Sequence, residues 1–343
     1  MPRIDLENFI TGIPKAELHM HLEGSIEAEL MFELARRNSV ALQWDTPEAL
    51  RAAYHFQDLQ SFLEIFWAGC AVLRQEQDFY DLTMAYLRRA RQDNVRRAEL
   101  FLGLQSFTLN GVSVKTVMDG VLRAFDDAAR ELGVSAALMV IAQRHRSEEA
   151  AFALLDAIEP WLPRIAAIGL GGPELGNPPS KFAEFFRTCK QRGLRVVIHA
   201  GEEGSAAYVR EALQLGAVRI DHGNACLDDP DLVQELATQG VPLTVCPLSN
   251  LKLRVVADLD RHPLKRLMDA GLMVTVNSDD PSYFGGYIAE NLVECQRALD
   301  LSPADIITLA RNSFIASFMS AHEKAAALEE IDRYVQEHAR GAG

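Results

Sequence analysis

The chain has 343 residues, of which 48% are hydrophobic and 24% are charged, a composition that excludes disordered and fibrous proteins and is typical of soluble globular ones. This length fits one large α/β barrel with insertions as well as it fits two average domains. The formal net charge of −14 at pH 7 would repel phosphate backbones and anionic membranes, so we expect neither nucleic-acid nor membrane partners.

Cysteine usage and the N-terminal sequence indicate the compartment. The five cysteines form no C-x-x-C pair, are odd in number and mostly lie in apolar surroundings, as reduced buried thiols do. The N-terminus lacks the apolar segment of a signal peptide, and no window approaches roughly 18 uninterrupted apolar residues. We therefore expect a cytoplasmic protein.

Eight short apolar or β-branched runs alternate with longer amphipathic stretches. The runs lie near residues 16–20, 96–102, 135–142, 165–170, 194–198, 218–221, 241–246 and 272–277. Residues 114–132 and 178–192 have helical spacing, the second stretch ending at Gly193, and residues 322–340 are expected to form a terminal helix. Eight alternations of strand and helix predict an α/β fold of the (β/α)8 TIM barrel type.

The interval between the first and second runs is longer than the others. Residues 24–95 contain several helical patterns and an aromatic-rich segment, 54–67. We expect residues 1–343 to form a single barrel domain, with 24–95 as a helical insertion over the C-terminal mouth of the barrel, where loops carry function.

The first run carries two histidines, His19 and His21, separated by one residue. On a helix of about 3.6 residues per turn their side chains would point about 200° apart, whereas on a strand they point to the same side. Pro14 before the run and Gly24 after it favour a short strand. Because neutral imidazole is a common ligand of zinc and related metals, the pair indicates a metal site. Two buried or tag-like histidines without a ligand are the alternative.

Three later runs end in polar residues. His199 and Glu202 follow the fifth run, His222 follows the sixth, and Asp279 and Asp280 follow the eighth. Since the C-terminal ends of barrel strands meet on one face, these groups are expected to converge with the histidine pair. Separately, each has a structural interpretation: a hydrogen-bonded core histidine, a carboxylate in the first turn of a helix, or a turn. Three histidines and one aspartate would give one metal ion four protein ligands and room for water.

Several motifs resemble the adenosine and adenine deaminase family of the amidohydrolase superfamily, over nearly the whole chain. They are KAELHMHLEGS at 15–25, EAELMFELARRN at 27–38, GNPPSKF at 176–182, RIDHG at 219–223, CPLSN at 246–250, NSDDP at 277–281 and FGGY at 284–287. The adenine deaminase branch is the most similar.

The resemblance implies a zinc-dependent hydrolytic deaminase of a 6-aminopurine, and it implies roles for individual residues. Glu202 would be the proton donor, His222 would activate the water, and Asp280 would contact the purine; we also assign Gly172 to substrate binding. The zinc ligands would be His19, His21, His199 and Asp279. Related hydrolases with two metals have a bridging lysine after the fourth strand, and residues 169–174 contain none, so we expect one zinc per chain.

Two strand ends depart from the adenine deaminase pattern. The second strand ends in Leu-Gly-Leu-Gln at 102–105 in place of Phe-Asp-Pro-Gln, and the fourth is followed by Leu-Gly-Gly-Pro-Glu at 170–174 in place of Leu-Asp-Ser-Ser-Glu. The pocket should therefore be less polar and roomier. Glu23 stands where adenosine-acting relatives usually carry an aspartate that meets the sugar. We expect adenine, or adenine with an alkyl group on N6, as the substrate; deamination of adenosine is the alternative.

A dinucleotide site and a purely binding role have weaker support. Residues 169–172 (GLGG) lack the G-x-G-x-x-G spacing of a dinucleotide site. A non-catalytic binding protein on the same fold usually loses a ligand or the proton donor, whereas this chain keeps all of these positions. His55, His145, His262, His322 and His338 are interpreted as surface or structural residues, although His145 lies within reach of the pocket rim. Iron or manganese in place of zinc, and assembly into a homo-oligomer, stay open.

Overall fold

The structure is a computed structural model that describes residues 6–56 and 59–341. Eight parallel strands pair in the order β1 to β8, each with the next along the chain. Their bounds are β1 Lys15–His21, β2 Val95–Leu102, β3 Ser135–Gln143, β4 Ile165–Gly171, β5 Val196–Ala200, β6 Arg219–His222, β7 Leu243–Val245 and β8 Val274–Val276. Every strand predicted from the apolar runs is present, and the (β/α)8 barrel is confirmed.

The first and last strands approach each other just beyond the end of β8. Met20 on β1 forms a parallel bridge with Asp279. The His21 N–H donates to the Asp279 carbonyl at 2.8 Å, and the Asp279 N–H donates to the His19 carbonyl at 3.0 Å. These two hydrogen bonds join β1 to the segment after β8, so the sheet curves into a nearly closed barrel.

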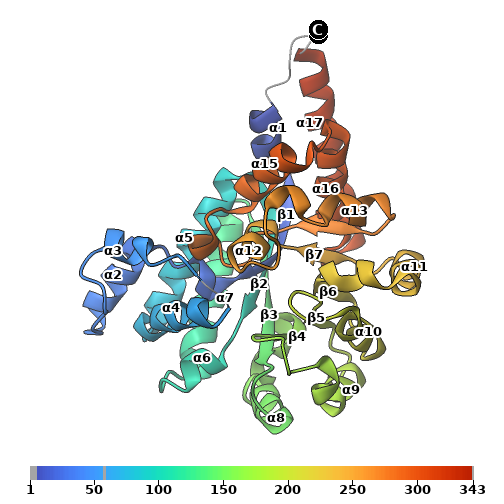
Figure 1. Ribbon diagram of the computed structural model, residues 1–343. Helices are drawn as coiled ribbons and strands as arrows, with labels where there is room; N and C mark the ends of the chain where they lie inside the picture. The colour runs from blue at the N-terminus through green and yellow to red at the C-terminus, as the bar shows by residue number, and fades with distance from the viewer. Residues whose placement is uncertain (1–5, 57–58, 342–343) are drawn as a thin grey trace.

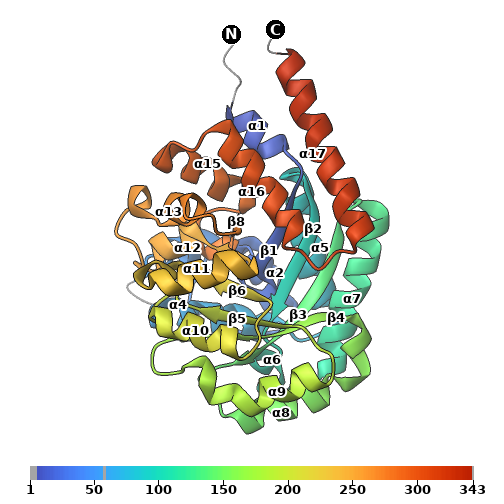
Figure 2. The same ribbon diagram turned by 90° about the vertical axis from the view of Figure 1, so that its right-hand side faces the viewer.

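Helices surround the barrel (Figures 1 and 2). Their bounds are α1 Leu6–Gly12, α2 Ala28–Arg37, α3 Pro47–Ala52, α4 Leu59–Val72, α5 Glu76–Gln92, α6 Gln105–Thr108, α7 Val114–Glu131, α8 Glu148–Ala157, α9 Ala183–Gln191, α10 Ala206–Gln214, α11 Pro230–Gln239, α12 Pro247–Lys252, α13 Leu264–Asp269, α14 Pro281–Phe284, α15 Ile288–Leu299, α16 Pro303–Ile315 and α17 Ala321–Gly341. Figure 2 places α1 and α17 at the same end of the molecule, where the rings of Phe9 and Tyr334 lie 5.4 Å apart.

Local sequence explains where these helices begin and end. The Ser113 side chain accepts the Thr116 N–H at the start of α7, and Asp229 caps α11 in the same way. Gly240 takes a left-handed conformation at the end of α11, with φ of 64°, which costs glycine no Cβ clash. Most strand residues are buried, because one face of each strand meets the barrel interior and the other meets a helix.

Residues 24–95 contain helices of two kinds. Figure 1 shows α2 and α3 extending away from the barrel. Helix α4 contributes side chains to the cavity at the C-terminal mouth. Helix α5 instead packs beside α7 and against β2 on the outside of the barrel.

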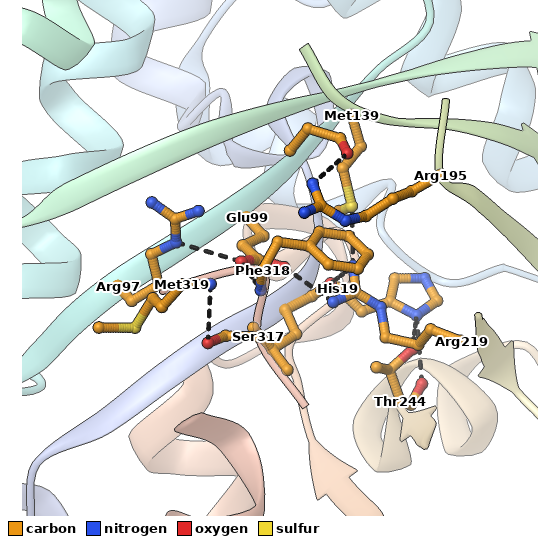
Figure 3. Close-up of polar contacts among 12 residues, drawn as sticks. His19, Arg97, Glu99, Met139, Arg195, Arg219, Thr244, Ser317, Phe318 and Met319 are labelled. Atoms are coloured by element: carbon orange, nitrogen blue, oxygen red, sulfur yellow. Dashed lines mark hydrogen bonds and ion pairs between the residues drawn. The ribbon is translucent and has the colours of Figure 1, made fainter. Parts of the chain in front are cut away.

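The barrel interior has an apolar layer made by Phe101, Met139, Ile141, Ala167 and Val197, against which Phe318 packs. Phe318 lies in the segment between α16 and α17. Figure 3 shows its ring beside the guanidinium of Arg219, whose Nη1 donates to Glu99 Oε2 at 2.8 Å. Phe318 and Arg219 lie below this layer, at the N-terminal end of the strands, whereas Ile141 reaches the cavity on the other side. Within the described ranges, no helix is both long enough and apolar enough to span a membrane.

Candidate active site

The predicted ligands come from three strands and meet at the C-terminal mouth of the barrel. The Nε2 atoms of His21 (β1) and His199 (β5) lie 3.2 Å apart. Oδ1 of Asp279, just past β8, is 3.5 Å from His19 Nε2 and 3.4 Å from His21 Nε2. His19, His21 and His199 form one group whose ligand atoms are close enough to share a cation. Asp279 belongs to two overlapping groups, one with His19 and His222 and one with His21 and Asp280.

The Nδ1 atoms of His19 and His199 face residues of β7 and β6. His19 Nδ1 is 3.0 Å from Thr244 Oγ1 and 3.1 Å from the Thr244 carbonyl (Figure 3), which leaves its Nε2 buried without a hydrogen-bond partner. His199 Nδ1 faces Asp221 Oδ2 at 3.4 Å. Metal-binding histidines usually direct the second ring nitrogen to a carboxylate or carbonyl in this way. The unpartnered His19 Nε2 therefore fits a metal ligand better than a hydrogen-bonded core histidine.

Burial changes the proton affinity of the same groups. It lowers the pKa of His21 to about 3 and lowers the pKa of His199 below its ordinary value. Burial would raise the pKa of Asp279, but the neighbouring imidazoles of His19, His222 and His21 outweigh it and hold that pKa well below the usual range. Neutral imidazoles and an ionised carboxylate are the protonation states in which these side chains bind metals.

Glu202 lies between β5 and α10, outside any helix, so its interpretation as a first-turn carboxylate is wrong. Its Oε2 is 3.4 Å from Nε2 of His222, and its Oε1 is buried without a hydrogen-bond partner. Burial raises the pKa of Glu202 well above its ordinary value, and the carboxylates of Asp279 and Glu174 act in the same direction. Both effects favour the protonated form of the side chain.

Asp280 is the neighbour of Asp279 and is equally enclosed. Burial raises its pKa well above the usual range, and the charge of Asp279 adds to the effect. Its Oδ1 is buried without a hydrogen-bond partner and lies so close to Gly24 that a Cβ added there would be 1.9 Å away. Gly24 thus makes the space in which this carboxyl group sits.

A cavity opens over these groups and contains about 730 Å³ of empty space, part of it open to solvent. Gly172, the predicted substrate-binding glycine, lines it, as do Glu202, His222 and Asp280. One wall is apolar and comes largely from α4, with single residues from β3, from the segment after α12 and from α14. Its members include Phe62, Leu63, Phe66, Trp67, Ile141, Leu253 and Phe284. His145 reaches the rim, one of the two possibilities that the sequence left open for it.

Glu23 also borders the cavity, beside the strand end where the sequence departs from the adenine deaminase pattern. Its Oε1 accepts the Gly103 N–H at 2.6 Å, and its Oε2 is buried without a partner. Burial raises the pKa of Glu23 to about 7. A Cβ at position 103 would lie 3.0 Å from Oε1, so a glycine there allows the contact.

Several residues that support the site had no predicted role. Asp221 faces His199, Thr244 contacts His19, and Arg144 donates from Nη1 to the His199 carbonyl at 2.8 Å. Glu174 hydrogen-bonds the backbone around Glu202. Position after a strand was a signal for Glu174, Asp221 and Arg144, because each lies at or just past the C-terminal end of β4, β6 or β3.

Comparison with known proteins gives a consistent picture. A family model described as adenosine deaminase matches residues 14–334. An adenine deaminase from Rhodopseudomonas palustris is 58% identical over 336 residues, covering 98% of each chain. One from Sphingopyxis alaskensis is 54% identical over 327 residues, 95% of this chain and 96% of the other.

Solved structures of an adenine deaminase and of an amidohydrolase are similar to this chain over nearly its whole length. An adenine deaminase from Arthrobacter aurescens has a TM-score of 0.93 and 46% identity, covering 95% of this chain and 100% of its own. An amidohydrolase from Burkholderia ambifaria with bound zinc has a TM-score of 0.88 and 26% identity, covering 97% and 94%.

Proposed function

The chain belongs to the adenosine deaminase family, and from that premise we propose that it hydrolyses adenine to hypoxanthine and ammonia with one zinc ion as cofactor. The observation that carries the proposal is the convergence of three imidazoles and one carboxylate beside Glu202, an acid whose pKa is raised. The near full-length identity of 58% to an adenine deaminase supports the choice of substrate.

We assign the metal site to side chains from β1, β5 and the end of β8. The unpartnered Nε2 of His19 and the 3.2 Å separation of the His21 and His199 nitrogens support this assignment, as does the zinc in the Burkholderia ambifaria amidohydrolase. The proposed ligands are His19, His21, His199 and Asp279. Zinc held there supplies Lewis acidity, which makes hydroxide available near neutral pH.

The remaining polar groups act on the substrate. Attack at C6 of a purine places negative charge on the ring unless N1 is protonated. Glu202, whose raised pKa favours its protonated form, gives that proton to N1. His222, 3.4 Å from Glu202, orients the attacking water and stabilises the charge that develops there. Asp280 and Gly172 contact the purine. Water adds at C6, and the C6–N6 bond breaks. One proton of the water leaves on N6 as part of ammonia, and the other replaces the proton that Glu202 gave to N1, so adenine and water become hypoxanthine and ammonia.

A free base is preferred over a nucleoside. The buried Glu23 carboxyl borders the cavity, anchored by Gly103, with one oxygen left for a ligand. We propose that Glu23 faces the ring edge that carries the sugar in a nucleoside. Such a placement disfavours a substituent on that edge, in keeping with the adenine deaminase names of the relatives.

A second candidate substrate is adenine with an alkyl group on N6, which would release an amine. The observation that favours it is the apolar wall formed by Phe62, Leu63, Phe66 and Leu253. Each methylene that such a wall buries contributes about 0.8 kcal/mol. A substituent of several carbons would therefore gain a clear preference if it reaches this wall.

The substrate is tested with a panel of adenine, N6-alkyl adenines, adenosine and 2′-deoxyadenosine, followed by the change in ultraviolet absorbance as the 6-amino group becomes 6-oxo. We expect the highest kcat/KM for a free base. If adenosine gives the highest value, the assignment to free bases is wrong. If N6-alkyl adenines are inert while adenine is turned over, only the second candidate fails.

We further propose that the chain works in the cytoplasm, without nucleic-acid or membrane partners, as one barrel domain with residues 24–95 as an insertion. The net charge of −14 supports the absence of polyanionic partners. The five cysteines are free and buried, as expected of a protein from a reducing compartment. A homo-oligomer stays a prediction that the mass in solution can check.

A further inference from the structure

Glu174, just after β4, makes an unusual set of hydrogen bonds with the loop that carries Glu202. Its Oε1 accepts the Gly201 N–H at 2.7 Å. Its Oε2 accepts the next three backbone N–H groups, from Glu202 at 2.9 Å, Glu203 at 2.8 Å and Gly204 at 2.9 Å. One carboxylate, only 2% exposed, thus serves four consecutive amides.

These amides have no partner in regular secondary structure. β5 ends at Ala200 and α10 begins at Ala206, so the segment 201–204 has neither a strand ladder nor a helix to fix it. Buried N–H groups need an acceptor, and hydrogen bonds to an ionised oxygen are about twice as strong as neutral ones. The Glu174 side chain therefore determines the backbone path on which Glu202 stands.

Gly204 also packs closely against the carboxylate whose oxygen accepts its N–H. A Cβ added to Gly204 would lie 2.9 Å from both Cδ and Oε1 of Glu174, and it would also press on the ring of Tyr208. The buried Arg144 holds the adjoining end of β5, through Nη1 to the His199 carbonyl at 2.8 Å. The segment is thus held between the ends of β3 and β4.

Glu174 does not itself line the cavity, although its neighbour Pro173 does. It cannot contact a substrate there and has to act through the residues that it holds. We propose that Glu174 is a positioning residue for the reaction: it fixes segment 201–204 and so places the Glu202 carboxyl beside His222 and the purine. This inference rests on the proposed function, because it takes Glu202 as the proton donor.

The proposal predicts a specific kinetic loss. In Glu174→Gln the side chain keeps its size but loses its charge, and its NH2 group faces at least one N–H donor. We expect kcat to fall on the order of 10- to 100-fold, the range for a misplaced catalytic group, with KM and bound metal little changed. Gly204→Ala should act in the same direction, because its methyl group displaces the carboxylate without removing a charge.

A double-mutant cycle separates positioning from general structural damage. Wild type, Glu174→Gln, Glu202→Gln and the double variant are compared by kcat, by metal content and by thermal unfolding. If Glu174 acts through Glu202, the double variant should be no slower than Glu202→Gln alone. If Glu174→Gln does not fold, Glu174→Asp takes its place, since the shorter side chain keeps the charge but cannot reach all four amides.

Asp78 offers a matched control. Its buried carboxylate accepts the Arg74 N–H at 2.9 Å and the Gln75 N–H at 2.8 Å before α5, and it does not line the cavity. Asp78→Asn should lower the unfolding temperature but leave kcat near that of the wild type.

The outcomes are distinguishable. Losses that multiply in the double variant, or unchanged kcat in both Glu174→Gln and Gly204→Ala, would overturn the positioning role and leave the proposed function intact. Near-normal turnover in Glu202→Gln would instead overturn the assignment of the proton donor.

Discussion

Two site residues, His222 and Asp279, hold backbone conformations that L-amino acids rarely adopt. Their φ angles are +67° and +62°, in the left-handed region. Each such residue costs on the order of 1–3 kcal/mol and persists only where its surroundings determine it. For Asp279 the determining contacts are the two backbone hydrogen bonds with β1. The strain is placed where the chain leaves β6 and β8, and it turns both side chains toward the cavity.

The role of Glu202 leads to a prediction about a single side chain. Glu202→Gln keeps the size of the side chain but removes the acidic proton, so we expect kcat to fall roughly 10²-fold or more while metal and fold are retained. Turnover of adenine and metal content, measured on the same preparation, test this. Loss of metal from the variant would contradict a role confined to proton transfer, because Glu202 is not among the proposed ligands.

The sequence predicted these polar residues better than it predicted their supports. His19, His21 and Asp279 stood out together, because the C-terminal ends of barrel strands converge on one face and each of these residues lies at such an end. Glu174 and Arg144 also follow strands, but the sequence did not identify what they hold, because their partners are backbone groups of segments that only the fold brings near. No residue pattern in the sequence marks a contact between a side chain and a distant amide.

At the scale of elements, the sequence predicted the strands, but it did not predict which helices line the mouth of the barrel. The apolar runs of β2 and β3 stand out because both faces of each strand are buried. Within 24–95, helical periodicity identified helices but not their partners, because an apolar stripe does not specify what it packs against. Only the structure separates α4, which lines the cavity, from α5, which covers the outside of the barrel.

A buried histidine between a 3-10 turn and a helix leads to a prediction of how the stability of the fold depends on pH. His262 lies between the 3-10 turn Leu259–Arg261 and α13, and it is 2% exposed. Its Nε2 is 3.1 Å from Asn250 Oδ1, and its Nδ1 accepts the Leu264 N–H, so both nitrogens are engaged in the neutral ring. Burial lowers its pKa from 6.5 to about 3.

Because the unfolded chain binds the proton more readily, this histidine stabilises the fold above pH 6.5, and that contribution is lost as the pH falls from 6.5 toward 3. Between these two pKa values, it changes the free energy of unfolding by up to about 1.4 kcal/mol per pH unit. We expect His262→Gln to be less stable at pH 7 but to lose stability less steeply below pH 6.5. Urea unfolding of metal-free proteins from pH 4 to 7 measures both curves. The exposed His322 gives the control, and a His262→Gln curve parallel to that of the wild type would contradict the prediction.

On the scale of the whole molecule, the proposed ligands connect distant parts of the chain. His19 and His21 lie on the first strand, His199 on the fifth, and Asp279 just after the last. Asp279 also supplies the backbone hydrogen bonds that join the two ends of the sheet. An ion at this site therefore connects strands whose ends come together only in the folded barrel, so it binds the folded chain and not the unfolded one.

This coupling predicts that the metal stabilises the fold. A ligand that binds only the folded state at about a thousand times its Kd adds about 4 kcal/mol to the free energy of unfolding. For a chain of this size, removal of the metal by a chelator should lower Tm by several degrees. We expect purified protein to contain about one zinc per chain, and its Tm to fall on chelation and recover when zinc is restored. The His19→Ala His21→Ala variant should contain no metal and should show the same Tm with and without chelator. Two tightly held ions per chain, or metal retained by that variant, would contradict the proposed ligands. A wild-type Tm that does not respond to removal of the ion would also contradict the site, because an ion held by β1, β5 and the end of β8 cannot leave without loosening the closure of the barrel.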